Sequence, residues 1–377
     1  MEEDAKRKLI ENLKQISDPR IERTKRHRLL DILVIAVLGT MCAVESYPEM
    51  EEYGYDKEEW LRTFLELPHG IPSHDTFRRV LQLLKPAEVE QAFRAWAAGM
   101  TQLNAGEIVA IDGKHLKGSK RKGESGHAGL RMVSAWATEN RVVLGQVKTQ
   151  EKSNEITAIP ELLQSLSLTG CVVTVDAMGC QKEIVREIRE QQADYVISLK
   201  GNQGNLHQEV KQYFEWTTQC PSQAVQMDVC ETVEKGHGRI ETRRCQVTED
   251  INWLVQKEDW VGLKSIVMVE AEREVIGQPA SSERRYFISS LAADAVTNLR
   301  AVRHHWQVEN SLHWVLDVAF REDACQVKNA TGATNLAVLR KIALNFLNQE
   351  KTCRLGIRGK MHKAGRNHAY LIKVLNI

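Results

Sequence analysis

The stretch EIVAIDGKHLKGSKRKG, residues 107–123, leads from an apolar run through a single acid, Asp112, into a cluster of basic residues punctuated by glycine. The short run EIVAI has the composition of a β-strand. Two similar runs follow it, GLRMVSAWA and RVVLGQVK, and the segment TEN, residues 138–140, connects them tightly. The sequence therefore predicts three consecutive strands, of which the first ends at Asp112.

Helices and strands alternate after these three strands. The helical pattern SNEITAIPELLQSL leads to the strand CVVTV, and the helical pattern CQKEIVREIREQQ leads to the strand YVISL. Three strands in a row followed by this alternation is the order of an α/β fold, in which a mixed sheet lies between helices. A ribonuclease-H-like core has this order, and we expect that fold class here.

The segments that flank this core have different patterns. Residues 1–104 contain apolar residues every three to four positions, which predicts helices, and residues 213–285 contain short alternating runs, which predict a β-rich insertion. The strand RRYFISSL then returns to the core, and a long helical pattern runs from Asn298 to about Phe320. The predicted organisation is an N-terminal helical domain at 1–104, the core at 105–212 and 286–350 around the insertion at 213–285, and a basic tail without acidic residues at 351–377.

The N-terminal segment carries one hypothesis about binding. In GIPSHDTFRRVLQLL, Ser73 is placed to cap a helix whose early turns carry Arg78 and Arg79. Such a helix is consistent with the recognition helix of a DNA-binding helix-turn-helix. The alternative, an ordinary amphipathic helix with solvated arginines, is the more common use of this pattern.

The composition limits the class of protein. With 377 residues, 42% of them hydrophobic, the chain can bury a large core. The formal net charge is +1, from 51 Lys and Arg against 50 Asp and Glu, so total charge neither requires nor excludes a nucleic-acid partner. The 8 cysteines form no C-x-x-C pair, which favours a reduced, cytoplasmic protein without a zinc site. We expect no secretion signal, because the start MEEDAKRKLIENLKQ is charged and lacks an apolar signal core. We also expect no membrane partner, because the most apolar segment, LLDILVIAVLGTMCAV, carries Asp31 and is shorter than the roughly 20 residues that span a bilayer.

Two aspartates each follow a predicted core strand. Asp112 ends EIVAI, and Asp176 ends CVVTV. In open sheets, ligands bind beyond the carboxyl ends of strands, so two acids in these positions can face each other. The alternative is that each aspartate only caps a turn or a helix.

A third group of polar residues lies in RHHWQVENSLHWVLDVAFRED. On a helix, His305, Glu309, His313 and Asp317 recur every four residues beside an apolar stripe. A carboxylate next to a buried stripe is costly unless a cation or a hydrogen-bond donor compensates its charge. The alternative is a solvated face on which Glu309 pairs with Arg303 or a histidine.

Carboxylates from the two strand ends and from this helix can together bind two Mg²⁺ ions, which prefer oxygen ligands. Two such ions about 4 Å apart activate an attacking hydroxyl group and stabilise the leaving oxygen of a phosphoryl transfer. The basic residues after Asp112 would then hold the polyanion that carries the phosphate. These residues are Lys114, Lys117, Lys120, Arg121 and Lys122.

Several stretches, in this order along the chain, resemble bacterial insertion-sequence transposases of the DDE class, in particular the H-repeat-associated family. The matching stretches are AIDGKHLKGS, VVTVDAMGCQKEI, YVISLKGNQ, HGRIETRR, RRYFISSL and HHWQVENSLHWVLDVAFREDA. The resemblance implies a ribonuclease-H-like catalytic domain that a β-rich insertion interrupts before the glutamate helix. Carried over position by position, it implies Asp112, Asp176 and Glu309 as the catalytic, metal-binding triad, with two Mg²⁺ ions per active site that Mn²⁺ can replace.

The resemblance also implies an activity and a partner. Such a protein binds double-stranded DNA at the terminal inverted repeats of its element, cleaves there to expose 3′-hydroxyl groups and joins these ends to target DNA. Pairing of two ends implies at least a dimer on DNA, and a bacterial transposase acts in the cytoplasm at the nucleoid. Two alternatives stay open: a metal-dependent nuclease with the same triad, and a DNA-binding relic of a transposase that has lost catalysis.

The surroundings of the glutamate depart from the pattern of related transposases. These often have a tyrosine seven residues before the glutamate, an arginine four before and a lysine seven after, where this chain has Val302, His305 and Leu316. His305 can replace the arginine as a phosphate donor, with only a partial charge near neutral pH. Arg303 and His313 are the other candidates. The departure leaves open whether a hairpin intermediate forms.

Four further basic residues are candidates for DNA contacts. Lys200 follows a core strand directly, so it can reach the active-site crevice, and a surface lysine is the alternative. In HGRIETRR, an extended strand would place His237, Arg239 and Arg243 on one side. The sequence therefore predicts a DNA-facing ribbon in the insertion.

Overall fold

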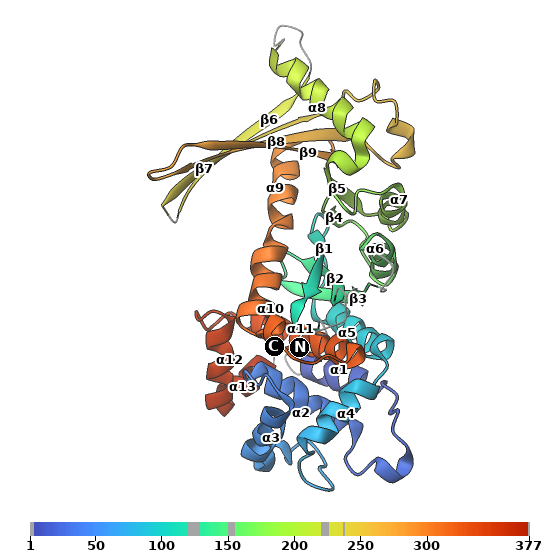
Figure 1. The fold of residues 1–377 in the computed structure, drawn as a ribbon, viewed down its shortest axis with the longest axis vertical. Coiled ribbons are helices and arrows are strands. Elements are labelled where there is room, and N and C mark those ends of the chain that lie inside the picture. Colours follow the sequence, from blue (N-terminus) through green and yellow to red (C-terminus); the bar gives the residue numbers. More distant parts are fainter. Residues whose placement is uncertain (1–3, 120–128, 150–154, 220–225, 237, 376–377) are drawn as a thin grey trace.

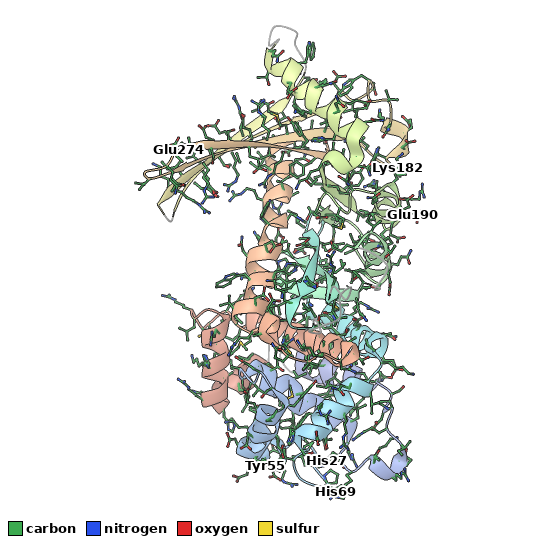
Figure 2. The ribbon with its side chains drawn as sticks, viewed as in Figure 1. His27, Tyr55, His69, Lys182, Glu190 and Glu274 are labelled. Carbon is green, nitrogen blue, oxygen red and sulfur yellow. The ribbon has the colours of Figure 1, made fainter. Side chains whose placement is uncertain are left out.

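The computed structural model describes residues 4–119, 129–149, 155–219, 226–236 and 238–375. The molecule is elongated: the N-terminal helices form one end, the core strands lie in the middle, and the strands of the insertion form the other end (Figure 1). The labelled side chains of Figure 2 mark these ends, with His27, Tyr55 and His69 at the helical end and Glu274 on the strands that project from the opposite end.

A nine-stranded sheet runs through the molecule in the order β3-β2-β1-β4-β5-β9-β8-β7-β6. Its core strands are β1 (Ile108–Leu116), β2 (Leu130–Ala137), β3 (Val142–Lys148), β4 (Val172–Val175) and β5 (Asp194–Leu199). The strands β1, β2 and β3 pair antiparallel with one another, and β4 and β5 lie parallel to β1. This is the ribonuclease-H-like order, so the predicted α/β fold class is confirmed.

Helices cover both faces of the core strands (Figure 1). On one face, α6 (Glu155–Gln164) packs on β2 and β3, and α7 (Lys182–Glu190) packs on β5. On the other, α9 (Ala295–His305) contacts β1, β4 and β5. At the centre, the residues from Ile108 to Ile111 are at most 2% exposed. A strand buried on both faces is apolar throughout, which explains the run EIVAI.

The strands of the insertion continue the core sheet. They are β6 (Asp228–Gly236), β7 (Arg239–Thr248), β8 (Ser265–Val275) and β9 (Ser281–Ser289). Because β9 pairs antiparallel with β5, the other three extend the sheet away from the core. The helix before them, α8 (Gly204–Gln219), runs past residue 213, where the sequence predicts the β-rich segment to begin. Leu206, Val210 and Phe214 form its buried stripe, and this helical spacing overrides the predicted boundary.

The remaining helices pack together at the other end. They are α1 (Asp4–Leu13), α2 (Leu29–Met41), α3 (Tyr47–Leu61), α4 (His74–Leu83), α5 (Pro86–Met100), α11 (Ala330–Gln349), α12 (Ile357–Arg366) and α13 (His368–Leu375). Ser73 caps α4, because its hydroxyl oxygen accepts a hydrogen bond from the N–H of Thr76 at 3.4 Å. The predicted basic tail is a pair of helices, α12 and α13, that pack on α11. Among the described residues, no helix has both the length and the apolar character required to cross a membrane.

Candidate metal centre

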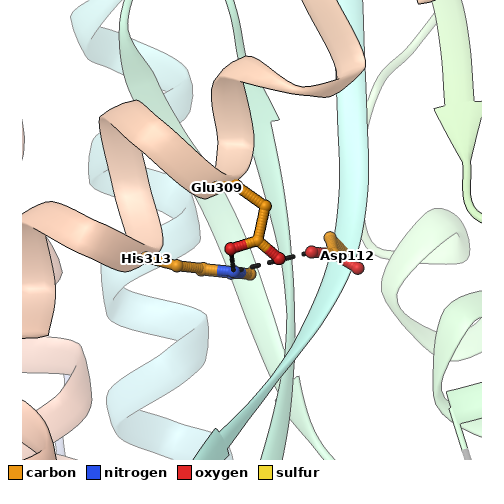
Figure 3. Close-up of side chains that lie close together, drawn as sticks. All are labelled: Asp112, Glu309 and His313. Carbon is orange, nitrogen blue, oxygen red and sulfur yellow. Dashed lines mark ion pairs between the residues drawn. The ribbon is translucent and has the colours of Figure 1, made fainter. Parts of the chain in front are cut away.

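Asp112 lies on β1 where the sheet meets the late helices. Its side chain is 14% exposed and faces Glu309 and His313 (Figure 3). Burial raises the pKa of Asp112 to about 8, and the neighbouring carboxylates of Glu309, Asp176 and Glu155 reinforce this effect. A carboxylate in these surroundings is costly to ionise without a compensating cation.

The register of the parallel pair β1 and β4 brings Asp176 beside Asp112. Ile111 pairs with Val175, so each aspartate is the next residue along its own strand. Asp176 directly follows the last residue of β4, whereas β1 continues past Asp112 to Leu116 in its pairing with β2, so the prediction that the first strand ends at Asp112 is wrong. Asp176 Oδ1 also accepts a hydrogen bond from the N–H of Gly179 at 3.1 Å, so this residue caps a turn as well.

Glu309 and His313 lie in a π-helical segment, η5 (Val308–His313), between α9 and α10 (Trp314–Val318). The predicted continuous helix from Asn298 to about Phe320 is therefore interrupted. A π-turn contains one more residue than an α-turn, so it changes which side chains face the sheet. Here both Glu309 and His313 point toward Asp112 (Figure 3).

His313 lies between the two carboxylates. Its side chain is 6% exposed, and Nδ1 lies 3.5 Å from Asp112 Oδ2 and 3.7 Å from Glu309 Oε2. A hydrogen bond from the imidazole holds the pKa of Glu309 below its ordinary value. Asp112, Glu309 and His313 together offer ligand atoms within 4.8 Å of one another. The predicted DNA contact of His313 stays a prediction, and it would require the buried ring to turn away from these two acids.

One pocket of about 240 Å³ brings the predicted triad together. Asp112, Asp176 and Glu309 all line it, although they come from three segments that are far apart in the sequence. Lys200 and His305, both predicted to contact DNA, line the same pocket. A phosphate that enters this space would meet three carboxylates and a lysine ammonium group.

His305 is held on the sheet side of this pocket. Its Nδ1 lies 3.1 Å from Thr174 Oγ1, and burial lowers the pKa of the imidazole. A neutral ring is a poor substitute for the arginine of related transposases. Arg285, which the sequence does not single out, lies in the pocket wall with its guanidinium group 4.8 Å from the centre of the Trp306 ring. Nothing in the local sequence pattern distinguishes Arg285, because it reaches the pocket through the pairing of β9 with β5, whereas Trp306 directly follows α9.

A fourth carboxylate, that of Glu155, also lies beside the site. A Cβ atom on Gly113 would lie 2.1 Å from the Glu155 carboxylate, so a side chain at position 113 would displace it. Burial raises the pKa of Glu155, and the charge of Asp176 contributes. The sequence marks this residue only as the start of a helix, which gives no signal of its place next to the triad.

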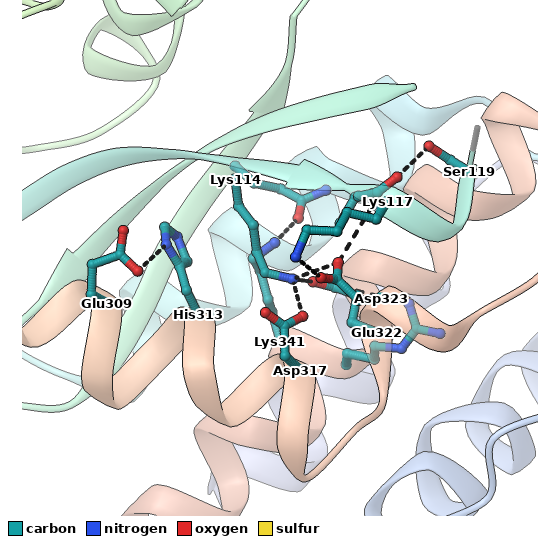
Figure 4. Close-up of polar contacts among 12 residues, drawn as sticks. Lys114, Lys117, Ser119, Glu309, His313, Asp317, Glu322, Asp323 and Lys341 are labelled. Carbon is teal, nitrogen blue, oxygen red and sulfur yellow. Dashed lines mark hydrogen bonds and ion pairs between the residues drawn. The ribbon is translucent and has the colours of Figure 1, made fainter. Parts of the chain in front are cut away.

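Lys114 is enclosed by acidic side chains (Figure 4), so its contact with DNA stays a prediction that would require these ion pairs to open. Its side chain is 9% exposed, and Nζ lies 2.9 Å from Glu322 Oε2 and 3.6 Å from Asp323 Oδ1 and donates a hydrogen bond to Asp317 Oδ1. Lys114 shares a face of β1 with Asp112, because side chains two residues apart on a strand point the same way. It therefore ties α10 and the turn after it to β1.

The basic residues of the insertion are paired with acids. Arg239 Nε lies 3.2 Å from Glu241, Arg243 lies 2.9 Å from Glu234, and Arg303 on α9 also pairs with Glu234. Arg239 and Arg243 lie on the same face of β7, since they are four residues apart on a strand. Their contact with DNA stays a prediction, and it would require these ion pairs to open.

Lys117 is 74% exposed and also has an acidic partner, Asp323, at 2.8 Å. Its DNA contact stays a prediction as well. The other basic candidates lie outside the described residues; they are Lys120, Arg121, Lys122 and His237.

Comparison with known proteins places these features in a family. The family described as "Transposase DDE domain" matches residues 104–346, and the family described as "DDE_Tnp_1-associated" matches residues 10–97. "Putative transposase YncI" of Escherichia coli O157:H7 is 38% identical over 371 residues, which are 97% of this chain and 94% of that protein. "H repeat-associated putative transposase YhhI" of Escherichia coli strain K12 is 35% identical over 98% of both chains.

Two further proteins are similar to this chain. "Uncharacterized protein in dhlA 3'region" of Xanthobacter autotrophicus is 46% identical over 283 residues, which are 74% of this chain and 93% of that protein. A piggyBac transposase solved as a synaptic complex with hairpin DNA aligns with a TM-score of 0.44 and 12% identity, over 99% of this chain and 78% of that one. The last likeness is too low to support an argument.

Proposed function

Since the chain belongs to the DDE transposase family, with H-repeat-associated proteins among its relatives, we propose that it is the transposase of a bacterial insertion sequence. The proposed protein binds double-stranded DNA at the terminal inverted repeats of its element, cleaves there and joins the 3′-hydroxyl ends to target DNA. Water is the first nucleophile and the 3′-hydroxyl group is the second. Because two ends have to be joined together, the proposal includes a dimer on DNA.

The observation that carries this proposal is the convergence of Asp112, Asp176 and Glu309 on one pocket. Carboxylates packed in this way repel one another, and the raised pKa of Asp112 reflects both its burial and that repulsion. Oxygen ligands gathered from separate segments fit hard divalent cations, which would compensate the charge. The donor set therefore suits Mg²⁺ or Mn²⁺.

Two divalent ions held by the three carboxylates would activate the attacking oxygen and stabilise the leaving oxygen of the phosphodiester. The residues of the chain position the reaction. Asp112 and Asp176 are fixed on neighbouring strands, whereas the Glu309 side chain is 56% exposed and approaches from the helix side. Lys200 and Arg285 line the same pocket, where their positive charges would attract the DNA phosphate.

Nicking of duplex DNA that carries the element ends, in Mg²⁺ or Mn²⁺, tests the triad. Asp112→Asn, Asp176→Asn and Glu309→Gln are each expected to lower the rate by more than roughly 100-fold, which is the loss caused when even an outer partner of a metal ligand is removed. Glu274→Gln, which changes an exposed acid on the projecting strands, is the matched control and should leave the rate unchanged. Equal rates in all variants and in the native protein would exclude the triad.

Strand transfer separates a transposase from a nuclease with the same triad. Pre-cleaved element ends with free 3′-hydroxyl groups are incubated with a supercoiled target plasmid and the native protein. The proposal predicts joined products that depend on Glu309. A protein that nicks DNA but yields no joined product under these conditions is a nuclease.

A further inference from the structure

The surface formed by α12 and the residues directly before it, 351–356, differs in charge from the rest of the chain. Residues 351–375 contain lysine or arginine at seven positions and no acidic residue, whereas the whole chain has 51 basic and 50 acidic residues. Most of these cations are exposed; they are Lys351, Arg354, Arg358, Lys363, Arg366 and Lys373. The molecule as a whole has a net charge near zero, but the surface formed by these residues is strongly basic.

The acid that precedes this segment, Glu350, is directed inward. It is 2% exposed, and its carboxylate accepts hydrogen bonds from the N–H groups of Thr352 at 3.0 Å and Cys353 at 3.1 Å. The Tyr370 hydroxyl group donates to it at 2.9 Å, and the buried Lys360 ammonium group lies 4.0 Å away. The charge of Glu350 is thus satisfied beneath the surface and does not neutralise the exposed cations.

The exposed arginines of this segment also lack acidic partners elsewhere. In the part of the chain that the structure describes, no carboxylate oxygen lies within 4.0 Å of the side chains of Arg354, Arg358 or Arg366. The predicted contacts Arg239 and Arg243 differ, since each is paired with a glutamate. A polyanion that binds α12 has to displace only water and small counterions, and the release of counterions favours binding.

The geometry of α12 presents these groups as a row. Arg358, His362 and Arg366 are four residues apart, which corresponds to about 6 Å along a helix axis, and they lie on one side. Met361 and Ala364 are buried on the opposite side, where α12 packs on α2 and α11. The packed side fixes the helix, so the cations are held in place on its outer surface.

We propose that the outer face of α12, together with Arg354 just before the helix, binds the phosphate backbone of duplex DNA outside the active site. The contact is electrostatic and independent of base sequence, because arginine side chains in such a row meet phosphates and not base edges. This inference rests on the proposed function, since it takes DNA as the substrate. It adds a binding surface from the C-terminal helices to a site built by the core.

Fluorescence anisotropy of a labelled duplex of random sequence, measured over a series of salt concentrations, tests the proposal in the full chain. The variant Arg354→Gln/Arg358→Gln/Arg366→Gln is expected to lower the slope of log K against log salt by about 2 to 3, because each phosphate contact contributes roughly 0.9. Its affinity at low salt should fall by at least about 10-fold. The control Arg7→Gln/Arg62→Gln/Lys182→Gln removes the same charge from exposed side chains that are already paired with acids, and its slope should change by less than about 1.

Equal slopes for the two triple variants would overturn the inference. Thermal unfolding checks that both are folded, and the single variants Arg358→Gln and Arg366→Gln, each expected to reduce the slope by about 0.9, replace the triple variant if it is not. Loss of binding to phosphatidylserine vesicles with an unchanged DNA slope would assign the surface to a membrane and also overturn it. A native protein that binds no duplex would contradict the proposed function itself, whereas native-like DNA binding and cleavage by the triple variant would contradict only this inference.

Discussion

Asp112 and Lys114 lie two residues apart on the same face of β1, and the late helices surround them in opposite ways. Asp112 faces the acid Glu309 together with His313, so its ionised form is disfavoured. Lys114 faces Asp317 and Glu322, so its charge is compensated in the interior. The charge of Asp112 therefore needs a compensating cation from outside the chain, whereas side chains of the protein itself already compensate the charge of Lys114.

Loss of the Lys114 charge should destabilise the fold strongly. In Lys114→Met, the Glu322 carboxylate, whose side chain is 1% exposed, loses its closest cation and keeps Arg340 at 3.6 Å, and breaking a buried ion pair costs about 3–5 kcal/mol. The free energy of unfolding in urea measures this loss. Lys117→Met, which removes an exposed partner of Asp323, is the control and should cost less than about 1 kcal/mol. Equal losses would mean that the enclosure of Lys114 does not contribute to stability.

At the scale of elements, a series of buried polar side chains joins the helices α5 and α11 to the sheet. Gln146 on β3 donates from Nε2 to Glu90 Oε1 on α5 at 3.3 Å, and its Oε1 accepts a hydrogen bond from Lys341 Nζ on α11. Burial raises the pKa of Glu90 to about 7 and lowers the pKa of Lys341 to about 8. The contact between these three elements is therefore sensitive to pH, away from the candidate metal centre.

Glu90→Gln should remove part of this pH dependence. The pKa of Glu90 is about 7 in the folded chain and near 4.5 in the unfolded chain, so the folded state binds more protons between these values. Stability contributed by this group is therefore present below pH 4.5 and lost as the pH rises through 7. The amide keeps the acceptor for Gln146, so we expect the variant to match the native protein near pH 4 and to exceed it by about 1–3 kcal/mol at pH 8. Parallel stability curves from pH 4 to pH 8 would contradict this.

At the scale of the whole molecule, the strands of the insertion belong to the same sheet as the core strands, but their burial changes along their length. Residues Ser265–Val269 of β8 and the end of β9 are buried against α9, whereas the far ends of both strands are exposed. The projecting part of β6 is mostly exposed, and that of β7 is half-buried (Figure 1). Strand pairing alone holds the far ends, and local stability falls where apolar burial ends.

Hydrogen exchange should show this gradient within single strands. Amides of residues 265–269 and 286–289 are expected to exchange only through global unfolding, because they lie in a buried core. Amides of residues 272–275 and 281–283 should exchange faster through local opening. Mass spectrometry of exchanged peptides measures the difference. Uniform protection along β8 and β9 would show that the projecting strands are as stable as the core.

Much of the fold could be predicted from local sequence, and much of the site could not. Strand composition gave β1 to β5, and the apolar run before Asp176 placed that residue at the end of β4, because a strand buried on two faces has to be apolar until it leaves the sheet. The same reasoning was wrong for Asp112, since β1 continues to Leu116 along β2. The π-helical turn at Glu309 was not predicted, since its apolar spacing also fits an α-helix. The enclosure of Lys114 was missed because its acidic partners lie about two hundred positions away in the sequence.

The sequence by itself determined the order of the elements and the ribonuclease-H-like class, and it predicted the triad Asp112, Asp176 and Glu309, because these depend on local composition and on short motifs. Only the tertiary structure decided which charges are compensated. Charge compensation depends on distance in space: the fold placed Lys114 among acids and His313 close to both Asp112 and Glu309, and within the described residues it left the arginines of α12 without acidic partners. The physical reason is that electrostatic interactions act between groups that the folded chain brings together, whatever their separation along it.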